Sequence, residues 1–211
     1  NEFADRDFKG KIRIVSFEND TDPLKLALRN AAVFPHLHHA APVDLMKHNK
    51  WLSPKANIEW ELIQGDFSET FPTAAKPHVI FYDPFSMVTN LELWGEDIFA
   101  RIFEHCRGNE VQLLNYSAST AFRATLLAVG FTVGYGPASG PKSTTTVAYN
   151  APALAMKQAA SLLGEEWLIR WEKSDVKAAR GLSQSDEKEF EEKIRRHEQF
   201  QHNSALEPRS T

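Results

Sequence analysis

Blocks of apolar and polar residues alternate along the first 150 residues, and they predict alternating strands and helices. The run KIRIVSF, Lys11–Phe17, is short and rich in β-branched residues, and the polar stretch ENDTDP stops it, as expected for a buried strand. Pro23 suits the first turn of a helix, and the polar side chains before it can accept hydrogen bonds from the free amide groups of that turn. We therefore expect a helix over about 23–34.

Three more apolar runs predict strands. They are IEWELI (58–63), HVIFY (78–82) and VQLLNYS (111–117). The first is followed by Gly65 and Asp66, and the second is followed at once by Asp83. The stretch before these strands is less periodic and predicts a second short helix near 43–51.

Two longer helices are expected beyond these loops. Thr89 and Glu92 have the spacing of a capping box, which predicts a helix start there. The apolar side of this helix carries Leu91, Trp94, Ile98, Ile102 and Cys106. Gly108 would end it. The second helix covers STAFRATLLAVGF, and its Gly130 can adopt the left-handed conformation that ends many helices.

The remaining sequence predicts a hairpin followed by helices. FTVGYG and STTTVAYN are joined by the Pro- and Gly-rich PASGPK, which is typical of two antiparallel strands. From Ala151 onward the pattern indicates helices only. Leu163, Trp167 and Trp171 share one helical face, and the charged stretch DEKEFEEKIRRHEQF predicts a helical appendage with a loose end.

These elements together predict an α/β fold. Alternating strands and helices favour a parallel, Rossmann-like sheet with helices on both faces. The hairpin adds antiparallel edge strands to that sheet. We expect one domain over residues 1–150 and a helical C-terminal extension over 151–211.

Composition narrows the classes of protein. A chain of 211 residues with 42% hydrophobic residues can bury a sizeable core. It contains no apolar run of about 18 residues and begins with a polar stretch, so we expect no membrane span, no signal peptide and a cytoplasmic location. The net charge of −4 predicts no strongly basic nucleic-acid surface. Cys106, at helical spacing from Ile98 and Ile102, is expected to be a buried apolar residue and not a nucleophile.

Acidic residues follow three of the predicted strands. They are Glu18, Asp66 and Asp83. Ligands of open α/β sheets lie beyond the carboxyl ends of the strands, so these acids are candidates for one site. Glu18 can accept hydrogen bonds from both hydroxyls of a ribose, and Asp66 can accept one from an adenine amino group with Phe67 packed against the ring. The alternative for Glu18 and Asp66 is a helix cap or a turn.

The stretches FYDPFSMVTNLELWGEDIF and NYSASTAFRATLLAVGFTV, followed by GPK, resemble the methyltransferase domain of the bacterial tRNA-modifying protein MnmC. That family carries a strand ending in Asp, a Pro-containing loop, a Glu-Leu-Trp triplet that opens a helix, and a Tyr-Ser turn before a helix ending in Gly-Phe. RIVSFENDTDPLKLALR is similar to the family's Ser-Phe-Glu turn. The resemblance covers about Ile12–Tyr149.

The resemblance implies a class I, Rossmann-like methyltransferase with S-adenosylmethionine as cofactor. It implies Glu18 and Asn19 at the cofactor ribose, Asp66 and Phe67 near adenine, and Asp83 at the cofactor and the methyl-transfer site. The family's acceptor is the amine on the side chain at carbon 5 of a wobble uridine, so tRNA is the implied partner. An ammonium must lose a proton before its lone pair can attack, and Asp83 can ease that loss. The alternative is that Asp83 caps the loop after it.

Five positions are candidates for the acceptor pocket. They are Phe85, Trp94, Tyr116, Ser117 and Lys142. Trp94 lies at a helical spacing that is more typical of core than of a wall for the cofactor or a base. Tyr116 and Ser117 can equally form an ordinary capped turn. Lys142 can touch a phosphate, although a single lysine on a loop is usually solvated.

Metal binding is not expected. The histidines at short spacing are His36, His38 and His39, with His48 further on. No cysteine or paired acids complete a ligand set with them. A polar loop over a pocket is the better interpretation.

The sequence departs from the family at its start. A strand and a Gly-rich loop, whose amides approach the methionine part of the cofactor, are not found before Lys11. Residues 1–150 would therefore lack the first strand of the fold. Met87 and Leu91 stand where the family often has Pro, so the acceptor can differ. Two other functions are alternatives. One is a non-catalytic binding module, and the other is a nicotinamide dehydrogenase, which the absence of GxGxxG disfavours.

Overall fold

The computed structural model describes residues 10–54, 57–84, 89–140, 143–178, 182 and 184–201. The chain divides into two compact units, Asn1–Ala75 and Lys76–Thr211, and each unit contains its own sheet. None of the described helices is both long and apolar enough to cross a lipid bilayer.

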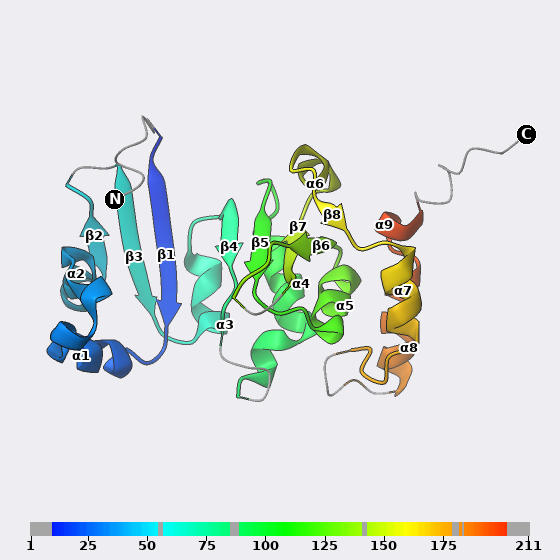
Figure 1. Ribbon diagram of the computed structural model, residues 1–211, viewed down its shortest axis with the longest axis horizontal. Coiled ribbons are helices and arrows are strands. Elements are labelled where there is room, and N and C mark those ends of the chain that lie inside the picture. Colours follow the sequence, from blue (N-terminus) through cyan, green and yellow to red (C-terminus); the bar gives the residue numbers. More distant parts are fainter. Residues whose placement is uncertain are drawn as a thin grey trace, which may run out of the picture. The chain divides into compact units, whose positions relative to one another are not determined.

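The sheet of the first unit has the strand order β1-β3-β2 (Figure 1). Strands β1 (Ile12–Glu18) and β3 (Ile58–Gln64) are parallel, and their register pairs Glu18 with Gln64. Both strands were predicted. Strand β2 (Lys50–Leu52) pairs antiparallel with β3 and was not predicted. Since β1 and β3 run in the same direction, the loops that follow them leave the sheet at one edge.

The other elements of this unit are short. They are α1 (Asp22–Arg29), α2 (Ala40–His48), α3 (Phe67–Thr70) and the 3-10 turns η1 (Ala31–Val33), η2 (Pro35–Leu37) and η3 (Phe71–Thr73). The helix predicted over 23–34 ends at Arg29 and gives way to 3-10 turns, because Asn30 leaves the helical conformation (φ −115°, ψ 30°) and its side-chain amide donates to the carbonyl of Leu26 at 2.9 Å. The helix predicted near 43–51 covers 40–48 instead, because Asn49 takes a left-handed conformation (φ 56°) and turns the chain into β2.

The sheet of the second unit has the order β4-β5-β7-β6-β8. Its strands are β4 (Val79–Phe81), β5 (Gln112–Asn115), β6 (Thr132–Gly136), β7 (Thr145–Tyr149) and β8 (Ser161–Leu162). Strands β4 and β5 are parallel, and the other pairs are antiparallel. The predicted hairpin, β6 and β7, is confirmed. Its position at the edge of the sheet is wrong, because β7 lies between β5 and β6 and the unpredicted β8 covers the outer edge of β6.

The second unit also contains helices between and after these strands. They are η4 (Leu91–Trp94), α4 (Glu96–His105), α5 (Thr120–Ala128), α6 (Pro152–Lys157), α7 (Glu165–Glu172), α8 (Gln184–Arg195) and α9 (Glu198–Gln201). The capping box predicted at Thr89 and Glu92 is wrong, because the chain there forms a 3-10 turn and the α-helix begins only after the extended Gly95. The predicted end of α5 is confirmed by the left-handed Gly130 (φ 104°).

An aromatic cluster fills the core of the second unit. Phe99 packs edge-on against Tyr82 and Phe122, with ring centroids 5.0 and 5.5 Å apart. Trp94 makes edge contacts with the same two partner rings. Cys106 is also fully buried, as predicted, and burial raises the pKa of its thiol to about 11. The thiol is therefore protonated and inert at neutral pH.

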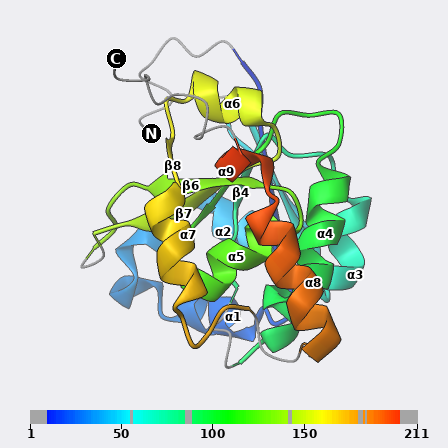
Figure 2. The same ribbon diagram turned by 90° about the vertical axis from the view of Figure 1, so that its right-hand side faces the viewer.

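The C-terminal helices pack onto this core. Helix α8 lies beside α5 (Figure 2), and its Phe190 and Ile194 are buried. Helices continue to Gln201, and the predicted loose end beyond them lies outside the described residues. The packing of α8 was not predicted, because the sequence pattern showed its charged outer face more strongly than its narrow apolar stripe.

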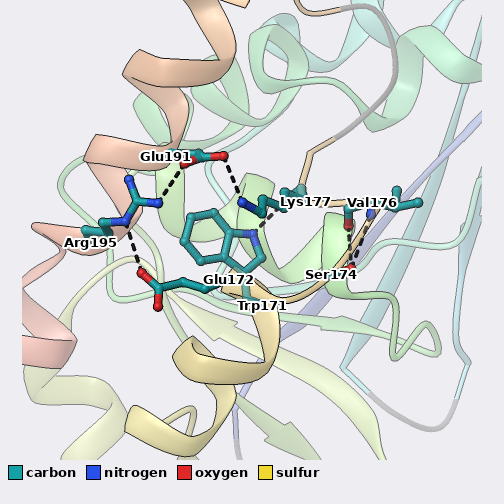
Figure 3. A network of polar contacts seen from close by, with 7 residues as sticks. All are labelled: Trp171, Glu172, Ser174, Val176, Lys177, Glu191 and Arg195. Atoms are coloured by element: carbon teal, nitrogen blue, oxygen red, sulfur yellow. Dashed lines mark hydrogen bonds and ion pairs between the residues drawn. The ribbon is translucent and has the colours of Figure 1, made fainter.

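A polar network holds the turn between α7 and α8 (Figure 3). The buried Trp171 donates its indole N–H to the carbonyl of Lys177 at 2.9 Å. Glu191 binds both Lys177 and Arg195, and Arg195 also binds Glu172. These contacts attach α8 to the end of α7.

Candidate active site

Glu18 and Asp66 lie at the same edge of the first unit's sheet. Glu18 ends β1 opposite Gln64, the last residue of β3, and the N–H of Gly65 donates to the Glu18 carbonyl at 3.0 Å. Asp66 follows directly. Parallel pairing thus brings together two acids that are 48 positions apart in the sequence.

Glu18 is half-buried and partly committed to its own loop. Its Oε1 accepts a hydrogen bond from the N–H of Asp20 at 3.0 Å, which fixes the carboxylate against the turn. Oε2 has no partner among the residues that the structure describes. Asn19, between the two, is exposed. The Glu18 carboxylate therefore retains acceptor capacity at the edge of the sheet.

Asp66 serves as the N-cap of α3. Its Oδ1 accepts from the N–H and the hydroxyl of Ser68, at 2.7 and 2.5 Å. The ring of Phe67 stacks on Phe71, with centroids 4.9 Å apart, and meets Phe17 edge-on at 5.2 Å. The cap that the sequence offered as an alternative for Asp66 is present, and the adenine contacts of Asp66 and Phe67 stay predictions.

In the second unit, Asp83 follows a tightly held residue. Tyr82 is buried, its N–H donates to Leu114 at 2.9 Å, and its hydroxyl donates to the carbonyl of Leu93. Burial raises the pKa of Tyr82, so the hydroxyl remains a donor. Asp83 itself is exposed. The chain therefore leaves the sheet at a fixed point and presents the Asp83 carboxylate to solvent.

Asn115 links the ends of β4 and β5, and sequence reasoning missed it. Its buried side-chain amide donates to the carbonyl of Tyr82, and its Oδ1 accepts from the N–H of Ser117 at 2.6 Å. One side chain thus positions both the residue before Asp83 and the turn after β5. The signal available in the sequence was an amide at the end of an apolar strand.

Asn90 contributes a buried acceptor just before η4. Its Oδ1 is buried and has no hydrogen-bond partner within the described parts of the chain. Its Nδ2 is 3.4 Å from a carboxylate oxygen of Glu92. Buried polar groups are nearly always paired, so this oxygen is suited to a donor that comes from a ligand.

The candidates for the acceptor pocket differ in exposure. Tyr116 is 42% exposed, whereas Ser117 is half-buried and its hydroxyl accepts from the N–H of Ser119 at 3.1 Å. Trp94 is only 2% exposed, so the structure gives it the packing role and its contact with cofactor or base stays a prediction. Phe85 and Lys142 lie outside the described residues.

Three of the histidines near the start have local contacts. His39 Nδ1 accepts from the N–H of Ala41 at 3.1 Å and caps α2, and His38 Nε2 is 2.8 Å from the carbonyl of Ala31. His36 packs edge-on against Phe34. Over the described ranges, no three His, Cys, Asp or Glu side chains gather as a metal site requires.

Comparison with known proteins identifies the family. The family model described as S-adenosyl-L-methionine-dependent methyltransferase matches residues 29–151. The chain belongs to this methyltransferase family. The match contains Asp66, Asp83 and Ser117 and begins after Glu18.

The methyltransferase also shares a fold with a solved structure. The crystal structure of MNMC2 from Aquifex aeolicus superposes with a TM-score of 0.55 at 20% identity, over 92% of this chain and 68% of that chain. No curated protein sequence matches the chain. The fold is therefore MnmC-like, which confirms the predicted fold class, and the family model confirms the predicted methyltransferase.

The family requires S-adenosylmethionine as cofactor, and the described residues fit one part of it. A carboxylate can accept hydrogen bonds from both hydroxyls of a ribose. In Glu18 only Oε1 is engaged, by the N–H of Asp20, and Oε2 has no partner among the described residues. When bound, this cofactor supplies a methyl group on a positively charged sulfur. Of the described residues, Glu18 is the one whose chemistry suits the ribose.

Proposed function

We propose that this methyltransferase acts on an amine, with the aminomethyl group of a wobble uridine in tRNA as acceptor. The observation that carries the proposal is the exposed Asp83 carboxylate just beyond the end of β4, a short distance along the chain from Asn90, whose buried Oδ1 has no hydrogen-bond partner among the described residues. A carboxylate and an amide oxygen are both acceptors, so they suit a donor such as an amine.

Asp83 would prepare the amine for attack. It accepts a hydrogen bond from the ammonium, orients it and eases the loss of its proton to solvent. The free lone pair could then attack a methyl donor only if the amine is held in place. Tyr82 and Asn115 fix the position of Asp83, and Asn90 adds a second acceptor.

We infer a cofactor site from Glu18, Asn19, Asp66 and Phe67 in the first unit. The support is the parallel pairing of β1 and β3, which gives their following loops a common edge. We further propose that residues 1–150 carry the chemistry and that 151–211 support it.

A second candidate function is a non-catalytic binding module with the same fold. The formal net charge of −4, which predicts no strongly basic nucleic-acid surface, favours it. Such a module would bind an acceptor without transferring a methyl group.

Two measurements on the full-length protein separate these functions. Calorimetry with S-adenosylhomocysteine tests the cofactor site, and a catalytic module should release or absorb heat at millimolar ligand or below. Transfer of labelled methyl is then measured with two otherwise identical tRNAs, one with 5-aminomethyluridine and one with uridine at the wobble position. If the protein is folded and binds S-adenosylhomocysteine but transfers no methyl group to either tRNA, the proposal of a wobble-uridine acceptor is rejected.

A further inference from the structure

Three polar side chains form a row across the second sheet. The registers pair Asn115 of β5 with Thr146 of β7, and Thr146 with Tyr135 of β6. Directly paired residues point to the same face of a sheet. Because β7 is antiparallel to both of its neighbours, β5 and β6 end at the same edge of the sheet. Asn115 is the last residue of β5, so the row lies at this edge, next to the turn that contains Ser117.

Arg123 of α5 reaches this row from the helix layer and is only 5% exposed. Its Nε donates to Thr146 Oγ1 at 3.0 Å, and its Nη2 donates to the carbonyl of Thr145 at 2.8 Å. Its guanidinium lies over the ring of Tyr135, 4.9 Å from the centroid. Every one of these partners is electrically neutral.

A second guanidinium meets the same tyrosine. Arg170 of α7 is exposed, and its Nη2 donates to the Tyr135 hydroxyl at 3.2 Å. Its Nε donates to the carbonyl of Glu166 and not to that residue's carboxylate. Within the described part of the chain, neither Arg123 nor Arg170 forms an ion pair.

Two positive charges therefore share one tyrosine without an anion. This differs from Arg195, which has two carboxylate partners. Burial lowers the pKa of Arg123, and the charge of Arg170 acts in the same direction. A buried charge without a counter-charge is costly, so such a pair is suited to an anion that arrives from outside.

The pair is also connected to the turn after β5. The hydroxyl of Thr146 accepts from Arg123 and donates to the carbonyl of Ser117 at 2.6 Å. Ser117 and Tyr116 are candidates for the acceptor pocket. An anion bound at Arg170 would thus lie on the side of the sheet from which the acceptor is expected.

We propose that Arg123, Tyr135 and Arg170 form a binding site for a phosphate group of the methyl acceptor. Arg170 contacts the phosphate, Tyr135 orients Arg170, and Arg123 adds buried positive charge beneath them. A nucleic acid supplies such a phosphate, so this site rests on the proposed function for its ligand.

The first experiment measures binding of a fluorescent RNA stem-loop between about 50 and 200 mM salt. We expect Arg170→Ala to weaken binding about tenfold and to reduce the slope of log K against log salt by about one. Tyr135→Phe keeps the ring under Arg123 and removes the hydroxyl, so it should give an intermediate loss. The control is Lys188→Ala, which removes the same charge from an exposed position on α8.

An unchanged salt slope in Arg170→Ala, or an equal loss in Lys188→Ala, would overturn the site. Thermal unfolding of each variant shows that folding is retained. If wild-type protein binds S-adenosylhomocysteine but no RNA, the proposal of an RNA acceptor is rejected. The phosphate site is then tested separately, by thermal unfolding in inorganic phosphate and in chloride at equal ionic strength. If phosphate raises the midpoint of thermal unfolding of the wild type but not that of Arg170→Ala, the phosphate site is supported. If phosphate does not raise the wild-type midpoint, the site is overturned.

Discussion

The side-chain amide of Gln199 exchanges two hydrogen bonds with the backbone of Val133. Val133 N–H donates to Gln199 Oε1, and Gln199 Nε2 donates to the Val133 carbonyl, both at 2.8 Å. Nε2 also donates to the carbonyl of Leu163 at 2.7 Å. A residue of the last described helix thus completes backbone pairing beside β6 and β8, 66 positions from its partner in the chain.

This contact predicts that Gln199 stabilises the second unit. Gln199→Ala removes the partner of a largely buried backbone N–H and two bonds to carbonyls, so we expect the free energy of unfolding to fall by about 2 kcal/mol. Urea denaturation measures it. Gln158→Ala, on the exposed glutamine directly after α6, is the matched control and should change stability by under about 0.5 kcal/mol. Equal effects of the two substitutions would show that the contact contributes nothing specific.

His197 predicts a pH dependence of the same region. Its Nδ1 accepts from the N–H of Gln199 at 3.2 Å, and burial lowers its pKa below the usual 6.5. The unfolded chain therefore binds a proton more readily than the folded one. The stability that depends on neutral His197 is complete above about pH 6.5 and is lost as the pH falls toward the folded pKa.

The measurement is urea denaturation at pH 7.5 and 5.5. His197→Asn is the comparison, because the asparagine oxygen can accept the Gln199 N–H at either pH. We expect the wild type to lose more stability than His197→Asn between the two values. An identical loss in both proteins would assign the pH dependence to other groups.

Cys106 predicts slow thiol chemistry. Its side chain is fully buried and its pKa is raised to about 11, so very little thiolate is present or accessible at pH 8. We expect a disulfide reagent to modify the native protein only on the timescale of unfolding, and the urea-unfolded protein at once, with one thiol per chain. Rapid labelling of folded protein would contradict the burial of this residue.

Asp83 and Glu18, proposed for the acceptor and for the cofactor, predict different kinetic effects. Asp83→Asn should lower kcat by about 100-fold or more and leave the affinity for S-adenosylhomocysteine within about twofold, since the carboxylate is assigned to the acceptor. Glu18→Gln keeps the bond to Asp20 but loses the charge, so cofactor affinity should fall about tenfold.

Glu69→Gln is the control for these substitutions, because it removes an exposed carboxylate on α3. Methyl-transfer rates and calorimetry measure both effects. Loss of cofactor affinity in Asp83→Asn with normal affinity in Glu18→Gln would reverse the two roles.

The sequence by itself determined most of the elements and the family. Strands β1, β3, β4 and β5 follow from short apolar runs that polar residues stop, because that pattern depends only on local burial. Gly130 marked the end of α5 for a similarly local reason, since few other residues take its left-handed conformation. The motifs around Asp83 and Ser117 were sufficient to predict a methyltransferase.

Tertiary structure decided which residues meet. The pairing of β7 between β5 and β6, the strand β8 and the packing of α8 depend on contacts between distant segments, which no local pattern encodes. Asn115 and Arg123 show the same limit. Each resembles an ordinary strand or helix residue in the sequence, and its role comes from partners that the fold brings to it: Tyr82 for Asn115, and Tyr135 for Arg123.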